Sequence, residues 1–151
     1  MTAAMERLRA GKEGGMDSDL QKAAGAARKH AHAPYSAYPV GAALRTRDGA
    51  VYAGCNVENA SFPEGWCAET SAIAAMVASG QVGDGRRIAT VCVIADKIDG
   101  RIVTPCGGCR QRLAEFGEPG TIVFAVAPDG DSRTFRLDEL LPAAFEMDHA
   151  Q

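Results

Sequence analysis

An apolar segment in the second half of the chain, RRIATVCVIAD at residues 86–96, has the length of a strand and few polar positions inside it. A strand that is apolar on both faces is stable only where other elements cover both faces, because either face would otherwise meet water. Segments of helical length precede and follow it. This alternation predicts a layered fold of helices and strands.

The remaining elements are predicted from local patterns along the chain. Helical patterning begins near Asp17, and two alternating apolar segments around Asp48 and Gly49 indicate a β-hairpin. Residues 67–80 have helical length and end at a glycine suited to a C-cap, and a shorter helix is expected over residues 106–117. Two strand-like segments and a helical turn complete the chain. We expect the order α-β-β-α-β-α-β-β-α, an α/β sandwich with helices on both faces of a mixed sheet.

The length of 151 residues favours one domain with a substantial core. Residues 1–15 are polar, contain glycine and lack periodicity, so we predict a disordered N-terminal extension and a single domain over residues 16–151. Met16, at this boundary, is a candidate alternative start.

Charge and hydropathy exclude two classes of partner. The net charge is -3, and the basic residues are scattered, so the electrostatic footprint of a nucleic-acid binder is missing. No apolar run approaches the length of a membrane span, and the N-terminal residues lack the apolar block of a signal peptide. We therefore expect a cytoplasmic protein that acts on small ligands, with no nucleic-acid or membrane partner.

Five cysteines in a reducing compartment are better explained as metal ligands, nucleophiles or buried small residues than as disulfides. Cys106 and Cys109 alone could be a redox pair, half of a structural zinc site or a coincidence. Cys67 supplies a third thiol, and catalytic zinc needs three protein ligands and an open position. Cys55 and Cys92 fall in strand-like segments and are expected to be buried, although Cys55 could be a fourth ligand.

Glu69 follows Cys67 by two positions, a spacing that places two side chains on different sides of a regular helix. The two can serve one site only at the first turn of the helix. The alternative is that Glu69 complements the helix dipole. Three thiolates around Zn²⁺ have a net negative charge, and two converging helix N-termini could offset it through about half a positive charge each and through amides that donate to sulfur.

Four segments between about Leu20 and Phe145 together resemble the small homotetrameric zinc-dependent cytidine deaminases: APYSAYPVGAAL, NVENASFPEGWCAE, PCGGCRQ and LLPAAF. The resemblance implies a three-layer α/β/α sandwich with a five-stranded mixed sheet. It also implies one zinc ion per subunit, bound by Cys67, Cys106 and Cys109, with Glu69 as the group that moves protons. The implied reaction is hydrolytic deamination of cytidine and 2'-deoxycytidine to uridine and 2'-deoxyuridine, with release of ammonia, in pyrimidine salvage.

The same resemblance implies the substrate-binding residues. Asn56 and Glu58 align with the residues that hold the ribose hydroxyls, and Ala68 with the residue whose backbone contacts the base. Tyr38 falls where the family usually has a phenylalanine against the pyrimidine, and Phe145 matches an aromatic residue donated by another subunit of a homotetramer with shared active sites. Without the motifs, Asn56 and Glu58 could simply end a strand and open a turn. The two aromatic residues could pack in the core.

Small residues surround the helix predicted at 67–80 and leave it little polar face, which independently indicates burial against a second subunit: Ala68, Ala72, Ala74, Ala75 and Ala78. His30 and His32 are expected at the surface, and Trp66 could line the pocket or a subunit contact. The family commonly has arginine directly after Cys-Ala-Glu, where this chain has Thr70 and Ser71. Arg110, or hydroxyl and amide donors, could take over the offset of thiolate charge.

Two other functions remain open. A deaminase of the blasticidin S type could use the same scaffold, although Asn-x-Glu and the terminal phenylalanine favour a nucleoside. Alternatively, zinc could join two helices in a protein without catalytic activity, which would be expected to have four protein ligands. Editing of DNA or RNA is disfavoured, because no cationic channel is visible in the sequence.

Overall fold

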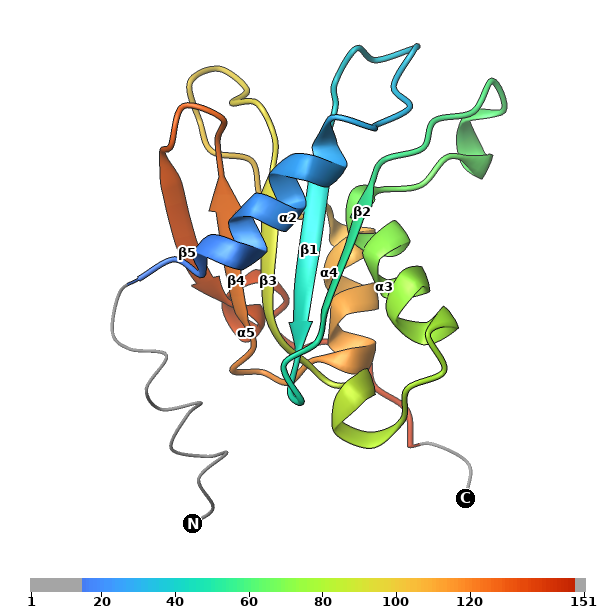
Figure 1. Ribbon diagram of the computed structural model, residues 1–151, viewed down its shortest axis with the longest axis vertical. Coiled ribbons are helices and arrows are strands. Elements are labelled where there is room, and N and C mark those ends of the chain that lie inside the picture. The colour runs from blue at the N-terminus through green and yellow to red at the C-terminus, as the bar shows by residue number, and fades with distance from the viewer. Residues whose placement is uncertain (1–14, 149–151) are drawn as a thin grey trace.

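The computed structural model describes residues 15–148, which form a five-stranded sheet with helices on both faces (Figure 1). The predicted order and the mixed α/β sandwich are confirmed. Apart from Gly15, the predicted N-terminal extension lies outside the described residues, and the single-domain boundary stays a prediction. In chain order the elements are α2 (Ser18–Arg28), β1 (Gly41–Thr46), β2 (Val51–Cys55), the 3₁₀ turn η1 (Phe62–Glu64), α3 (Ala68–Ala78), the 3₁₀ turn η2 (Gly83–Arg86), β3 (Ile88–Ile94), α4 (Gly107–Phe116), β4 (Ile122–Val126), β5 (Ser132–Arg136) and α5 (Leu137–Leu140).

The strands are ordered β2-β1-β3-β4-β5 across the sheet. The β3–β4 pair is parallel and the other three pairs are antiparallel, so the sheet is mixed. The predicted hairpin is β1–β2, with Gly49 in its turn at φ +96°. Its first strand is covered on both faces, because α2 packs on one face, against Ala43, and α3 on the other, against Ala42 and Leu44.

Two apolar cores lie on the two faces of the sheet. Figure 1 shows α2 on one side of the sheet and α3 and α4 on the other. β3 contributes to both cores: Cys92 and Ile94 face α2, whereas Val91 and Val93 face α3 and α4. The alternation of side chains along a strand explains this division. It confirms the prediction that residues 86–96 contain a strand covered on both sides.

The close approach of α2 to β1 depends on Gly41. A Cβ at this position would lie 2.0 Å from the carbonyl oxygen of Ala24 and 2.7 Å from the backbone nitrogen of Arg28. Backbone atoms of a helix cannot yield as the end of a side chain can, so any side chain here pushes α2 away from the sheet.

We expect Gly41→Ala to lower the free energy of unfolding by about 1–3 kcal/mol or more, as overpacked cores do. Denaturant unfolding measures the change. Gly120→Ala is the matched control, because a Cβ at Gly120 meets no atom within 4 Å. Equal stability of the two variants would contradict the close contact.

Helix α3 buries one side in this chain and exposes the other. Ala72, Ile73 and Met76 are in the core, whereas Ala74, Ala75 and Ala78 are exposed. Full burial of this helix, which its composition predicts, is therefore not achieved within a single chain.

Within residues 15–148, none of the helices combines the length and the apolar character needed to cross a bilayer.

Candidate active site

The N-termini of α3 and α4 bring three thiols together. Cys67 is the N-cap of α3, Cys106 is the N-cap of α4, and Cys109 lies in the first turn of α4. Their sulfur atoms all lie within 4.8 Å of one another, and Cys67 Sγ is 3.8 Å from Cys106 Sγ. The structure thus brings together the three predicted zinc ligands, which are separated by up to 42 positions in the sequence.

Glu69 is in the first turn of α3, the one place where it and Cys67 can face the same site. Its side chain is buried, with 4% of the residue exposed, and Cys109 Sγ lies 3.4 Å from Glu69 Oε2. At this distance the thiol of Cys109 donates a hydrogen bond to the carboxylate. Glu69 therefore meets the thiols directly, which the helix-dipole interpretation does not require.

Contacts within the site shift the pKa values of two of the thiols and of the Glu69 carboxyl group. Hydrogen bonding from Cys109 holds the pKa of Cys67 down at about 6, against the opposing effects of burial and of the Glu69 charge. Hydrogen bonding to Cys67 raises the pKa of Cys109, and burial raises it further. Burial also raises the pKa of Glu69. Neither N-cap sulfur accepts a hydrogen bond from its own helix, so the expected amide donors are not used in this arrangement.

The donor set fits zinc. Three thiols from two helix starts are the type and number of ligands that a catalytic zinc site uses, with one position left for a non-protein ligand. Among the described residues, the group includes neither Glu69 nor Cys55, so it lacks the fourth ligand of a structural site. Cys92 is fully buried, as predicted, whereas Cys55 at the end of β2 is only partly buried. Cys55 is at the last position of an edge strand that is open on one face.

A pocket of about 680 Å³ opens beside the thiols. This volume is in the range of sites that bind small organic molecules. Its mouth has exposed aromatic side chains, including Trp66 at 52% exposure and the edge-to-face pair of Tyr35 and Phe62. The predicted site residues that line the pocket come from four separate segments: Tyr38, Asn56, Glu58, Cys67, Ala68, Glu69 and Cys106.

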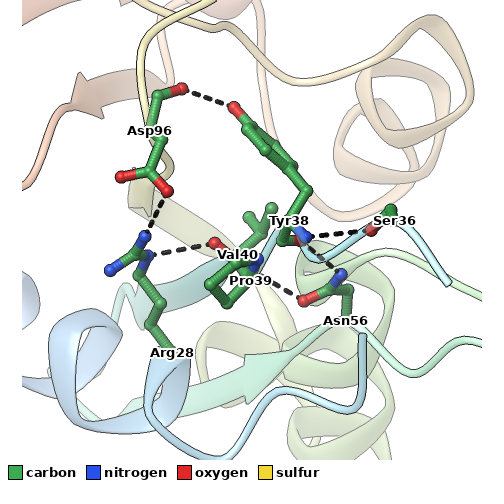
Figure 2. Close-up of polar contacts among 7 residues, drawn as sticks. All are labelled: Arg28, Ser36, Tyr38, Pro39, Val40, Asn56 and Asp96. Carbon is green, nitrogen blue, oxygen red and sulfur yellow. Dashed lines mark hydrogen bonds and ion pairs between the residues drawn. The ribbon is translucent and has the colours of Figure 1, made fainter. Parts of the chain in front are cut away.

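Asn56 and Glu58 lie at the pocket wall and also hold the neighbouring loop of residues 35–40. The Asn56 side chain accepts a hydrogen bond from Val40 N at 2.9 Å and donates one to Tyr38 O at 3.0 Å (Figure 2). Glu58 accepts from the Ser36 hydroxyl and from two backbone amides of the loop, and these contacts, the hydroxyl foremost, hold its pKa below the usual value. Asn56 does follow the last residue of β2, but the two side chains hold the 35–40 loop at the edge of the pocket and do not open a turn of their own.

Phe145 lies away from this pocket. Its side chain is 71% exposed and its carbonyl oxygen accepts a hydrogen bond from Gln111 at 2.9 Å. It is the one predicted site residue apart from Cys109 that does not line the pocket in this chain. The alternative that Phe145 packs in the core is therefore wrong for this chain, because its side chain is exposed in the segment that follows α5. His30 and His32 are exposed, as predicted.

Sequence patterns missed part of the pocket wall. Val93 and Ala95 at the end of β3, and Val103 and Thr104 before the Pro105–Cys106 pair, all line the cavity. The signal available was topological, because β3 and β4 are parallel and pockets form at the carboxyl ends of such strands. The sequence left open whether Trp66 lines the pocket, and in the structure it does.

Known proteins resemble this chain in sequence and in fold. The family model "Cytidine and deoxycytidylate deaminase zinc-binding region" matches residues 16–126. A cytidine deaminase of Sporosarcina psychrophila is 40% identical over 122 residues, covering 81% of this chain and 85% of the relative. The crystal structure of a cytidine deaminase from Burkholderia pseudomallei matches with a TM-score of 0.78 and 41% identity, covering 87% of this chain and all of the other.

The chain belongs to the cytidine and deoxycytidylate deaminase family, as the motifs predict. A more distant relative, a blasticidin-S deaminase of Bacillus cereus, is 30% identical over 108 residues, which cover 70% of this chain and 76% of that protein.

Two arginines of α4 lie near the thiols, with different surroundings. Arg110 donates to Pro105 O at 2.7 Å, to Leu140 O at 2.7 Å and to Thr104 Oγ1 at 2.8 Å, so it joins α4 to α5 and to the loop before it. Arg112 folds back over Gly108, where a Cβ would lie 2.9 Å from its Nη1. Its positive charge acts on Cys67 and on Glu69.

The hydroxyl groups that replace the usual arginine are directed elsewhere. Ser71 Oγ donates to Cys55 O at 2.7 Å and accepts from Trp66 Nε1 at 3.0 Å. Thr70 Oγ1 is buried without a hydrogen-bond partner among the described residues. Arg112 is therefore a better candidate than Arg110 or these hydroxyls for offsetting thiolate charge.

We expect Arg112→Ala to weaken zinc binding by roughly two- to fivefold, the scale of an exposed charge interaction. Arg112→Lys should keep most of the affinity, because it keeps the charge. Competition with a chromophoric chelator measures the affinity. Arg110→Ala should instead lower the free energy of unfolding, and equal zinc affinities of the alanine and lysine variants at position 112 would refute the charge effect.

Proposed function

We propose that the protein catalyses the hydrolytic deamination of cytidine and 2'-deoxycytidine to uridine and 2'-deoxyuridine, with release of ammonia, in cytoplasmic pyrimidine salvage. The observation that supports this most is the position of Glu69. Its carboxylate meets the thiol trio and lines the same pocket, but is not part of the trio. One zinc ion per subunit, held by Cys67, Cys106 and Cys109, completes the proposed site.

Cys67, Cys106 and Cys109 would hold zinc as thiolates, and the metal would supply a Lewis acid that lowers the pKa of water at the site. Glu69 accepts the proton that the attacking water loses and delivers it to N3 of the pyrimidine, which makes C4 electrophilic. The water oxygen bonds to C4. Glu69 then takes the remaining proton of the new C4 hydroxyl and passes it to the exocyclic amine, the C4–N bond breaks, ammonia leaves and the C4 carbonyl forms. Because Glu69 is 4% exposed, bulk water has little access to this proton path.

The pocket wall supplies groups for a nucleoside. Asn56 and Glu58 are proposed to hold the ribose hydroxyls, Ala68 to contact the base through its backbone, and Tyr38 to lie against the pyrimidine. Asn56 uses one amide hydrogen and one oxygen lone pair within the protein, so a second hydrogen and a second lone pair are left for a ligand. Glu58 is ionised at neutral pH and can accept from a hydroxyl.

We also propose a homotetramer in which each active site takes Phe145 from another subunit. Two observations support it: α3 exposes the small side chains of Ala74, Ala75 and Ala78, and Phe145 is 71% exposed. Small residues on a helix allow close approach of a second helix. Light scattering at micromolar concentration should give four times the mass of one chain, and a monomer would refute this part of the proposal.

Deamination of a blasticidin-type compound is the second candidate, favoured only by the similarity to the Bacillus cereus enzyme. Purified zinc-loaded protein mixed with cytidine should lose the ultraviolet absorbance of the cytosine ring within minutes. Product analysis with cytidine, 2'-deoxycytidine and blasticidin S separates the candidates. Turnover of blasticidin S alone would overturn the proposal, and no turnover of any of the three would favour a structural role for the metal.

A further inference from the structure

The loop of residues 35–40 forms one side of the pocket, and its second half is held at every polar backbone group. Tyr38 N donates to Ser36 Oγ at 3.0 Å, and Tyr38 O accepts from Asn56. Val40 N donates to the Asn56 side chain, and Val40 O accepts from Asn56 N at 3.3 Å. Pro39 has no N–H, and its carbonyl oxygen accepts from Arg28 Nε at 3.0 Å. Apart from Ser36, these partners lie outside the loop, so they fix its position on the rest of the protein.

Arg28 joins this loop to the segment that follows β3. It is the last residue of α2, and besides Pro39 O its guanidinium contacts the Asp96 carboxylate, with Nη2 2.8 Å from Oδ2 (Figure 2). Asp96 lies two residues beyond the end of β3, next to Ala95 in the pocket wall. The planar guanidinium can serve both acceptors at once, which the single ammonium of a lysine does less well.

The Tyr38 side chain also joins the 35–40 loop to Asp96. Its hydroxyl donates to Asp96 O at 2.5 Å, so the ring extends from the loop to the end of β3, as Figure 2 shows. A phenylalanine, the usual residue of the family here, could not make this bond. Burial raises the pKa of the Tyr38 phenol, with a further contribution from Asp96, so the hydroxyl remains a donor at neutral pH.

We propose that Arg28, Asp96 and the Tyr38 hydroxyl form a clasp that fixes the 35–40 loop against the end of β3, and that Arg28 is a positioning residue for substrate binding. Arg28 does not line the pocket, and it acts by holding the Pro39 carbonyl and the Asp96 side chain. The effect on substrate rests on the proposed function, because it assumes that the ring of Tyr38 meets the pyrimidine. A fixed ring needs no ordering when substrate arrives, which strengthens binding.

The chain offers a matched control in a second ion pair of α2. Arg45 contacts Asp17, the N-cap of α2, with Nε–Oδ2 at 2.7 Å and Nη2–Oδ1 at 2.9 Å. The exposed fractions of the two arginine side chains are similar, 28% for Arg45 and 22% for Arg28. Arg45→Ala therefore removes a comparable ion pair at the other end of the same helix, away from the pocket.

The first measurement needs no substrate. Hydrogen exchange of the amides of residues 35–40 in zinc-loaded protein should become faster in Arg28→Ala and in Tyr38→Phe, and stay unchanged in Arg45→Ala. Unchanged exchange in both clasp variants, or equally fast exchange in the control, would overturn the clasp. This result stands whether or not cytidine is the substrate.

The second measurement is steady-state kinetics with cytidine. Arg28→Ala and Tyr38→Phe should each raise KM roughly three- to tenfold, the size expected for one lost hydrogen bond, with a smaller change in kcat. The KM of the double variant should rise by a smaller factor than the product of the two single increases, because both groups hold the same loop. Faster exchange with an unchanged KM in the clasp variants would refute the positioning role of Arg28. If the unmodified protein did not turn over cytidine, the proposed function would be refuted instead.

Discussion

Replacing Glu69 with glutamine is expected to leave zinc bound and to lower kcat for cytidine by about 10²–10⁴-fold, the contribution of a positioned acid–base group. The amide has nearly the shape of the carboxyl group but cannot accept the proton of water or pass it to N3 and the amine. The carboxylate is not in the thiol trio, so the metal ligands remain complete. Metal analysis and steady-state kinetics on the same preparation measure both quantities.

Glu64→Gln is the matched control, because Glu64 lies on the exposed turn η1 close to the pocket mouth and loses the same charge. Its kcat should equal that of the unmodified protein. A Glu69→Gln variant that retains more than about a tenth of the kcat would show that Glu69 is not the proton-transfer group. Loss of zinc together with activity would show that it is a ligand.

Replacing Cys106 with alanine is expected to lower zinc affinity by more than about 100-fold, because loss of even an outer partner of a ligand costs about 10–100-fold. Turnover should fall with the metal content. Cys106 is exposed, so this change removes a ligand without leaving a cavity in the core. Competition with a chelator measures the affinity, and unfolding experiments on metal-free protein should show that the fold is kept.

Cys55→Ala is the matched control for the trio. Cys55 lies at the end of β2 outside the thiol group, so its loss should leave zinc affinity and turnover unchanged. Loss of zinc in the Cys55 variant would give the site a fourth protein ligand and would favour a structural metal. Full zinc retention by the Cys106 variant would rule out the proposed trio.

Local signals in the sequence were sufficient for the elements of the fold. The glycine-containing turn at Asp48–Gly49, the glycine after α3 and the apolar run of β3 each have a short-range physical cause, and each marked an element that the structure contains. The thiol trio was predictable as well, because zinc restricts its ligands to a few residue types and Cys67, Cys106 and Cys109 all lie at helix starts. Position relative to Cys67 likewise limited Glu69 to the first turn.

Contacts between distant segments could not be predicted in this way. Arg28 meets Asp96 across 68 positions, and neither residue has a local pattern that selects the other. Arg110 has the position in the sequence that suggests charge compensation, yet its guanidinium is directed to carbonyl and hydroxyl oxygens, and Arg112 lies over the helix start instead. The direction of a long side chain depends on which partners the fold brings within its reach.

The amino-acid sequence by itself determined the order of the elements, the two-sided burial of β3 and the residue types at the metal site, because propensity, periodicity and ligand chemistry act over a few neighbouring residues. Only the tertiary structure decided that Glu69 meets Cys109, that Asn56 and Glu58 hold the loop beside the pocket, and that Arg28, Tyr38 and Asp96 join its two walls. These contacts arise from the packing of α2, α3 and α4 on the sheet, and packing depends on all segments together.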